Sequence, residues 1–207
     1  MKRLFVLIIL ILSITILSGC KFHRTTTAGP TVATTTEDPN YIFLSSLLNK
    51  NYNHVEISIK DTFSDNSVLN SSYIINTSGN NTEIDYSYET LNKITVSGNS
   101  VVIPDEMKKV HTGKATYQNG TLVNNTGDIN IKIDKLDIKK INIDLSNFSN
   151  VSITSSSFTA NVNKSSYLGI DNFSNMVLSI SFDLNKILKI TLSYYSDGVN
   201  TTIEYVL

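Results

Sequence analysis

The chain is constrained most by an alternation of apolar and polar residues over residues 54–60, in which every second side chain is Val or Ile. Residues 68–76 form a second run rich in β-forming residues, and residues 84–88 alternate again. The turn-forming segments Asp65-Asn66 and Ser78-Gly79-Asn80-Asn81 separate these three runs. A period of two residues is that of a half-buried β-strand, and short polar turns join antiparallel neighbours. We therefore expect an antiparallel sheet.

Further strands are predicted along the rest of the chain. They are Lys93–Val96, Val101–Ile103, Ala115–Tyr117, Leu122–Asn124, Val151–Val162, Val177–Phe182, Ile187–Tyr195 and Asn200–Val206. Residues 128–150 begin like a strand, up to Ile133, and are expected to continue as a short helix or irregular turn that ends near Phe148. Residues 167–175 are expected to form a loop or a single helical turn.

A helix is predicted before the first strand. Asp38 supplies a capping carboxylate. Pro39 has no N–H group, which costs nothing in the first turn of a helix because N–H groups there have no partner within the helix. Apolar residues from Phe43 to Leu48 recur at a spacing of three to four, which forms one apolar stripe on a helix ending near Asn51. The expected class is α+β: a large curved, half-barrel-like antiparallel sheet with an N-terminal amphipathic helix packed on one side.

Residues 1–19 have the parts of a secretory signal peptide. Lys2 and Arg3 precede an apolar run from Leu4 to Leu17, and small residues follow it. The run has about 14 residues, whereas a helix that crosses a bilayer needs roughly 20. We therefore expect residues 1–19 to be removed on export.

The segment Leu17-Ser18-Gly19-Cys20 resembles the lipobox of bacterial lipoproteins. The resemblance implies cleavage before Cys20 and attachment of diacylglycerol to its thiol. Cys20 is the only cysteine, so no intramolecular disulfide can form. Because two acyl chains suffice for stable anchoring, the expected location is the extracytoplasmic face of the cell membrane.

Residues 20–36 are predicted to be a flexible tether, because Thr25–Thr36 is rich in threonine and poor in large apolar residues. Residues 37–207 suffice for one sizeable core and are expected to form a single domain. Lysine is used almost to the exclusion of arginine. Because AT-rich codons favour this bias, it indicates a low-GC bacterium.

Charge and motif content argue against several function classes. Without Lys2 and Arg3, 15 of the 17 basic residues stand against 18 acidic ones, a net charge of −3, and no long basic block occurs, so we expect no nucleic-acid binding. His23, His54 and His111 lack the spacing of zinc ligands. Neither a Gly-x-Ser-x-Gly motif nor a glycine-rich phosphate loop is present. We expect no enzyme activity, no metal and no cofactor.

Two other residue types were considered for a site. Asp61, Asp65, Glu83, Asp85 and Glu89 fall at positions predicted to face solvent, so a catalytic acid pair, as a secreted hydrolase would need, is not expected. Tyrosines suit sugar or peptide contacts on an exposed face, but a half-buried sheet also favours them. They are spread over the predicted strands as Tyr73, Tyr86, Tyr88, Tyr117, Tyr167, Tyr194, Tyr195 and Tyr205.

The order of elements over residues 37–207 resembles that of periplasmic lipoprotein carriers and mycobacterial lipid-transport lipoproteins, in which a half-open barrel surrounds an apolar cavity. The resemblance implies a non-enzymatic lipoprotein that binds an apolar or lipid ligand on its concave sheet face. The candidate ligand contacts are Ile57, Ile84, Ile180 and Leu192.

A helix packed tightly on the sheet with no cavity would contradict this hypothesis. The alternative is a surface interaction or adhesin module that binds a protein or glycan through an exposed aromatic patch over a filled core.

Overall fold

The computed structural model describes residues 38–91, 95–97, 100–102, 108–127 and 138–207. The predicted signal peptide, the lipobox with Leu17, Ser18, Gly19 and Cys20, and the tether lie outside the described residues. The predicted strand up to Ile133 lies outside them as well.

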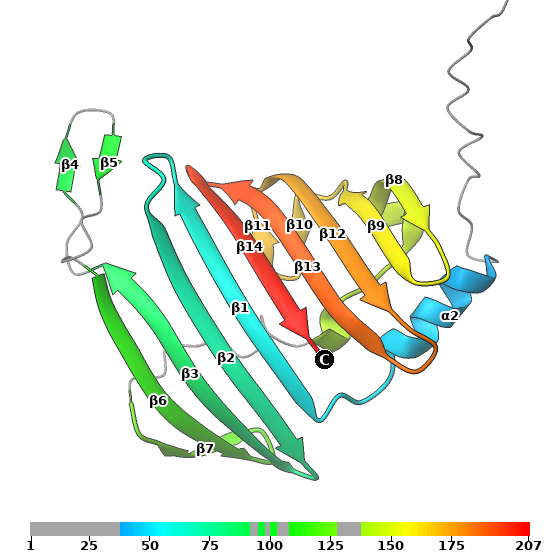
Figure 1. The fold of residues 1–207 in the computed structure, drawn as a ribbon, viewed down its shortest axis with the longest axis horizontal. Coiled ribbons are helices and arrows are strands. Elements are labelled where there is room, and N and C mark those ends of the chain that lie inside the picture. Colours follow the sequence, from blue (N-terminus) through cyan, green and yellow to red (C-terminus); the bar gives the residue numbers. More distant parts are fainter. Residues whose placement is uncertain (1–37, 92–94, 98–99, 103–107, 128–137) are drawn as a thin grey trace, which may run out of the picture. The chain divides into compact units, whose positions relative to one another are not determined.

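Ten strands form one antiparallel sheet (Figure 1). They are β1 (His54–Phe63), β2 (Val68–Ser78), β3 (Asn81–Leu91), β6 (Lys108–Gln118), β7 (Thr121–Asn125), β8 (Phe148–Ile153), β9 (Ser157–Val162), β12 (Ser174–Phe182), β13 (Ile187–Ser196) and β14 (Val199–Val206). Their order is β7-β6-β3-β2-β1-β14-β13-β12-β9-β8. Strands β1 and β14 therefore pair at the centre of the sheet, although they are the first and last strands of the described chain.

Two short hairpins lie outside this sheet. They are β4 (Thr95–Ser97) with β5 (Ser100–Val102), and β10 (Ser166–Tyr167) with β11 (Ile170–Asp171). The second hairpin occupies the segment for which a loop or helical turn was predicted, and that prediction was wrong. Leu168 and Gly169 both have positive φ, at 53° and 71°, which is the backbone that a two-residue hairpin turn requires.

One of two further local predictions needs correction. Residues 151–162 are not one strand, because Thr154 ends β8 and starts a turn in which its Oγ1 accepts hydrogen bonds from Ser156 N at 3.3 Å and Ser157 N at 3.0 Å. The short helix or irregular turn predicted to end near Phe148 is confirmed, because residues 138–147 contain two short 3₁₀ turns, η3 (Ile138–Lys140) and η4 (Leu145–Asn147), and Phe148 begins β8.

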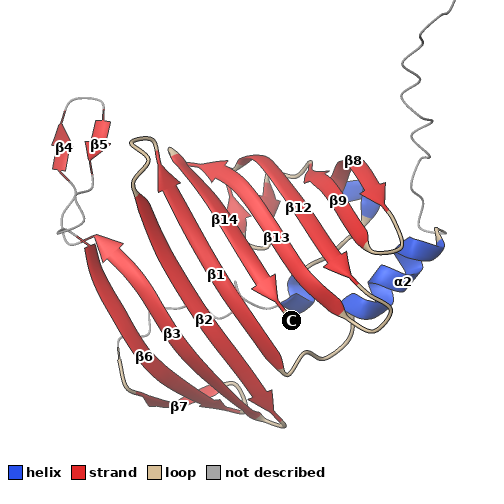
Figure 2. Cartoon of the chain, in the orientation of Figure 1, coloured by secondary structure: helices blue, strands red, loops and turns tan. Residues whose placement is uncertain are grey.

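One α-helix is described, α2 (Pro39–Leu48), and its predicted start is confirmed. Asn40 N donates a hydrogen bond of 2.8 Å to Asp38 Oδ1, so Asp38 is the N-cap. The helix ends three residues before the predicted Asn51. The described residues are mostly strand (Figure 2), so the large antiparallel sheet is confirmed, whereas the α+β prediction assigned too much weight to the helix.

Helix α2 contributes Leu44, Leu47 and Leu48 to the main hydrophobic core, and its Phe43 ring lies 6.1 Å from that of Phe182 in β12. The strands contribute alternate residues to the same core, because their side chains point to opposite faces in turn. We call the face of the sheet that carries these buried residues the inner face, and the opposite one the outer face.

Tyr86 lies on the inner face opposite Gly113 of the neighbouring strand. Its hydroxyl donates a hydrogen bond of 3.2 Å to Asn125 Oδ1, and the ring is buried. A Cβ atom at Gly113 would overlap the phenol, coming within 2.7 Å of its Cζ atom. Glycine at residue 113 therefore makes room for Tyr86.

Gly113→Ala should lower the free energy of unfolding by about 1–3 kcal/mol, the usual effect of overpacking a filled interior. Thr112→Ala is the matched control, since Thr112 is exposed on the same strand. Urea denaturation of the full chain measures both variants. Equal stability of the two would show that Tyr86 moves aside without cost.

Candidate functional site

The inner face carries a cavity of about 150 Å³. Its walls come from three central strands and from the β10–β11 hairpin. The lining residues are Ile59, Asp61, Leu168, Ile170, Leu192, Tyr194, Thr201, Ile203 and Tyr205. Several of them, such as Asp61, Ile170 and Tyr194, are only half-buried, so the cavity has an accessible side.

Strand register explains why these residues meet. In β1, β14 and β13 the cross-strand partners of Ile203 are Ile59 and Leu192, which together form an apolar row. The adjacent row on the same face consists of Asp61, Thr201 and Tyr194. The cavity therefore has an aliphatic side and a polar side, which are formed by two adjacent cross-strand rows.

The polar row is connected by hydrogen bonding. Thr201 Oγ1 donates to Asp61 Oδ1 at 2.6 Å. Burial raises the pKa of the Tyr194 phenol, a hydrogen bond with Thr201 opposes that rise, and the charge of Asp61 adds to it. The polar row thus holds a carboxylate beside a phenol that stays protonated.

Asp61 was expected to face solvent, and this expectation was wrong. The residue follows Val55, Ile57 and Ile59 at a spacing of two, so it lies on the same inner face as they do. The alternation that predicted β1 therefore already contained the signal for Asp61.

The four predicted ligand contacts all lie on the inner face but do not form one site. Ile57, Ile84, Ile180 and Leu192 are each at most 2% exposed. Only Leu192 lines the cavity. The other three side chains fill the core, where neighbouring side chains surround them.

Most tyrosines in the described chain are directed inward. The rings of Tyr86 and Tyr88 lie 6.0 Å apart, and Tyr88 stacks on His111 at 4.7 Å and 6°. His111 lies within β6, where its Nε2 is 2.9 Å from Thr90 Oγ1. By contrast, Tyr195 is 43% exposed.

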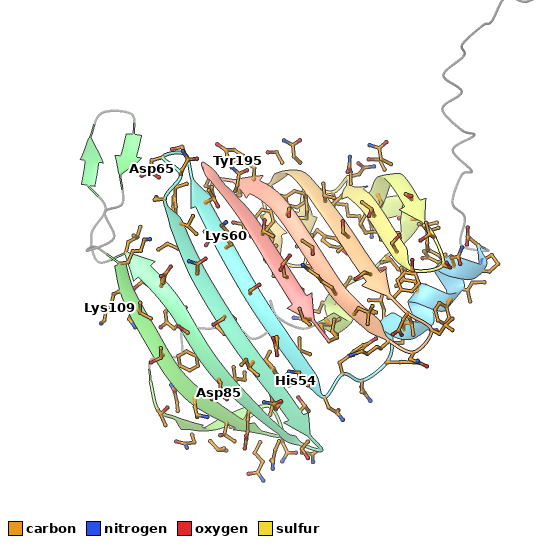
Figure 3. The ribbon with its side chains drawn as sticks, viewed as in Figure 1. His54, Lys60, Asp65, Asp85, Lys109 and Tyr195 are labelled. Atoms are coloured by element: carbon orange, nitrogen blue, oxygen red, sulfur yellow. The ribbon has the colours of Figure 1, made fainter. Side chains whose placement is uncertain are left out.

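The outer face carries a larger and more polar groove of about 610 Å³. It runs over β14, β1, β2, β3 and β6. The lining residues are Ser58, Ile59, Lys60, Asn70, Ser71, Ser72, Ser87, Glu89, Val110, Thr202 and Glu204. Glu89 Oε2 accepts hydrogen bonds from Asn70 N at 2.6 Å and Asn70 Nδ2 at 3.3 Å. Figure 3 labels Lys60, which lines the groove, and His54, which begins the same strand, β1.

Other kinds of site were searched for in the described ranges. No three His, Cys, Asp or Glu side chains gather there in a way that could hold a metal ion. No helix among the described residues has both the length and the hydropathy to cross a membrane.

No protein-family model matches this chain, and no curated protein matches it in sequence. Its function is therefore inferred from its own residues, from the inner-face cavity and from the outer groove.

Proposed function

We propose that the chain is a membrane-anchored extracytoplasmic lipoprotein that binds, without catalysis, the apolar part of a ligand on the inner face of its sheet. The observation that carries this proposal is the inner-face cavity of about 150 Å³. Its walls are largely aliphatic and a few polar groups converge at one side, which is typical of small-molecule sites.

The cavity volume limits the size of the ligand group. An aliphatic cavity of about 150 Å³ accommodates a molecule the size of benzene. The cavity of this chain has that volume. It therefore suits a ring or a short alkyl segment, and a complete lipid would have to leave most of its acyl chains outside.

Helix α2 leaves room for such a ligand. Its buried leucines pack into the core, but none of its residues lines the cavity. In the lipoprotein carriers that the element order resembles, a half-open barrel surrounds an apolar cavity in the same way as this proposal supposes. The lipobox residues Leu17 to Cys20 support the anchor.

The outer groove supports a second candidate, a surface module that binds a protein or glycan. Its volume of about 610 Å³ is within the usual range for ligand sites. However, Ser, Thr and Asn side chains line most of it and no aromatic residue does. Because a ligand would have to displace water that such side chains bind well, we rank this candidate second.

Toluene binding tests the cavity function. In the full chain, held in phosphatidylcholine nanodiscs, toluene should shift the methyl NMR signals of Ile59, Leu192 and Ile203, which line the cavity. Ile170→Trp fills the cavity from the hairpin and should weaken binding about tenfold or more. Leu188→Trp is the matched control, since Leu188 is 39% exposed and lies outside the cavity.

Two outcomes would count against the cavity function. One is an absence of shifts at the three cavity methyl groups at millimolar toluene. The other is equal binding by the Ile170→Trp and Leu188→Trp variants. A ligand that copurifies with the full chain from its host, detected by native mass spectrometry, would support the function directly.

A further inference from the structure

Among the described residues that line the inner-face cavity, Asp61 is the one that carries a carboxylate. Its Oδ1 atom accepts the hydrogen bond from Thr201. Among the described residues, no lysine, arginine or histidine forms an ion pair with Asp61, and its Oδ2 atom has no hydrogen-bond partner. The carboxylate therefore has unused capacity to accept hydrogen bonds, beside apolar walls.

The charge of Asp61 acts on two phenols of the inner face. Burial is the main reason why the pKa values of Tyr73 and Tyr194 are raised, and the charge of Asp61 contributes to both. Tyr194 lines the cavity, and Tyr73 is buried on the same face.

We propose that the cavity takes a ligand in which an apolar group about the size of a benzene ring is joined to a protonated amine. The apolar group lies against Ile59, Leu192 and Ile203, and the ammonium donates hydrogen bonds to Asp61 in the adjacent row. This inference rests on the proposed function and adds the chemical class of the ligand.

The selectivity follows from the charge of Asp61. A hydrogen bond between charged groups stabilises a complex more than a hydrogen bond between neutral groups does. For a ligand ammonium at Asp61, we expect this difference to lower Kd about ten- to a hundredfold. A carboxylate ligand would instead bring a second negative charge close to Asp61. A neutral alcohol has one hydroxyl donor and should bind with intermediate affinity.

Three probes that share one ring size test this inference: benzylamine, benzyl alcohol and benzoate. Each is titrated at neutral pH into the full chain in phosphatidylcholine nanodiscs, and the methyl signals of Ile59 and Ile203 report binding. Benzylamine should bind at least about tenfold more tightly than benzoate. Asp61→Asn should abolish this preference, whereas Glu56→Gln, which removes a negative charge from the outer face of β1, should preserve it.

The outcomes separate this inference from the proposed function. If the three probes bind with similar affinity, or if Asp61→Asn keeps the preference for benzylamine, the ligand class is wrong and the cavity function stands. If no probe shifts the cavity methyl signals, both are wrong. The comparison of probes on the unmodified chain remains decisive even if Asp61→Asn fails to fold.

Discussion

In the Cys20→Ser variant, we expect no chain of the mature size in the membrane fraction. A serine hydroxyl cannot form the thioether that the proposed lipidation requires, and each methylene of an acyl chain that is buried in a membrane contributes about 0.8 kcal/mol to binding. The variant should therefore appear in the soluble fraction, or as a precursor that retains residues 1–19. Cell fractionation with intact-mass measurement distinguishes these forms.

Ser18→Ala is the matched control for this experiment. It changes a residue in the same four-residue segment but keeps a small side chain before Cys20, so the chain should stay anchored and lipidated. A Cys20→Ser chain that remained membrane-bound at the mature size would show that residues 17–20 are not a lipobox.

Leu47→Ala should lower the free energy of unfolding by about 2–5 kcal/mol, because it leaves a cavity where a completely buried side chain was. Leu47 is 0% exposed, and it joins α2 to the core formed by the strands. Tyr52 strengthens this junction, since its hydroxyl donates to Leu47 O at 3.0 Å and accepts from Ile187 N at 3.0 Å.

Ile42→Ala on the same helix is the control for Leu47→Ala, because Ile42 is 57% exposed and its truncation should change stability by less than about 0.5 kcal/mol. Urea denaturation of the full chain, followed by circular dichroism, measures both variants. Similar stability of the two would show that α2 is not part of the cooperatively folded core.

Local patterns in the sequence were sufficient for much of the fold. The alternation of residues 54–60 predicted β1, and the pair Asp38-Pro39 predicted the start of α2, because both signals depend only on neighbouring residues. The turn at Thr154 was missed although it also depends only on neighbouring residues. This side-chain turn interrupts a segment whose composition, rich in Ser, Thr and Val, is otherwise that of a continuous strand.

The candidate site was less predictable. Leu192 was identified as a ligand contact, but Ile57, Ile84 and Ile180 were indistinguishable from it in the sequence, since all four are aliphatic residues in alternating segments. Whether such a residue fills the core or lines a cavity depends on what covers it. In the structure, the β10–β11 hairpin places Leu168 and Ile170 at the cavity that Leu192 lines.

The sequence by itself determined most of the strands, where α2 begins and which residues share a face of a strand, because these properties follow from backbone periodicity and capping. Only the tertiary structure decided that Asp61 meets Thr201, 140 residues away, and that Tyr194 lies in the same row. The physical reason is that β1 and β14 pair at the centre of the sheet. That pairing depends on long-range packing of the whole inner face, which no local pattern encodes.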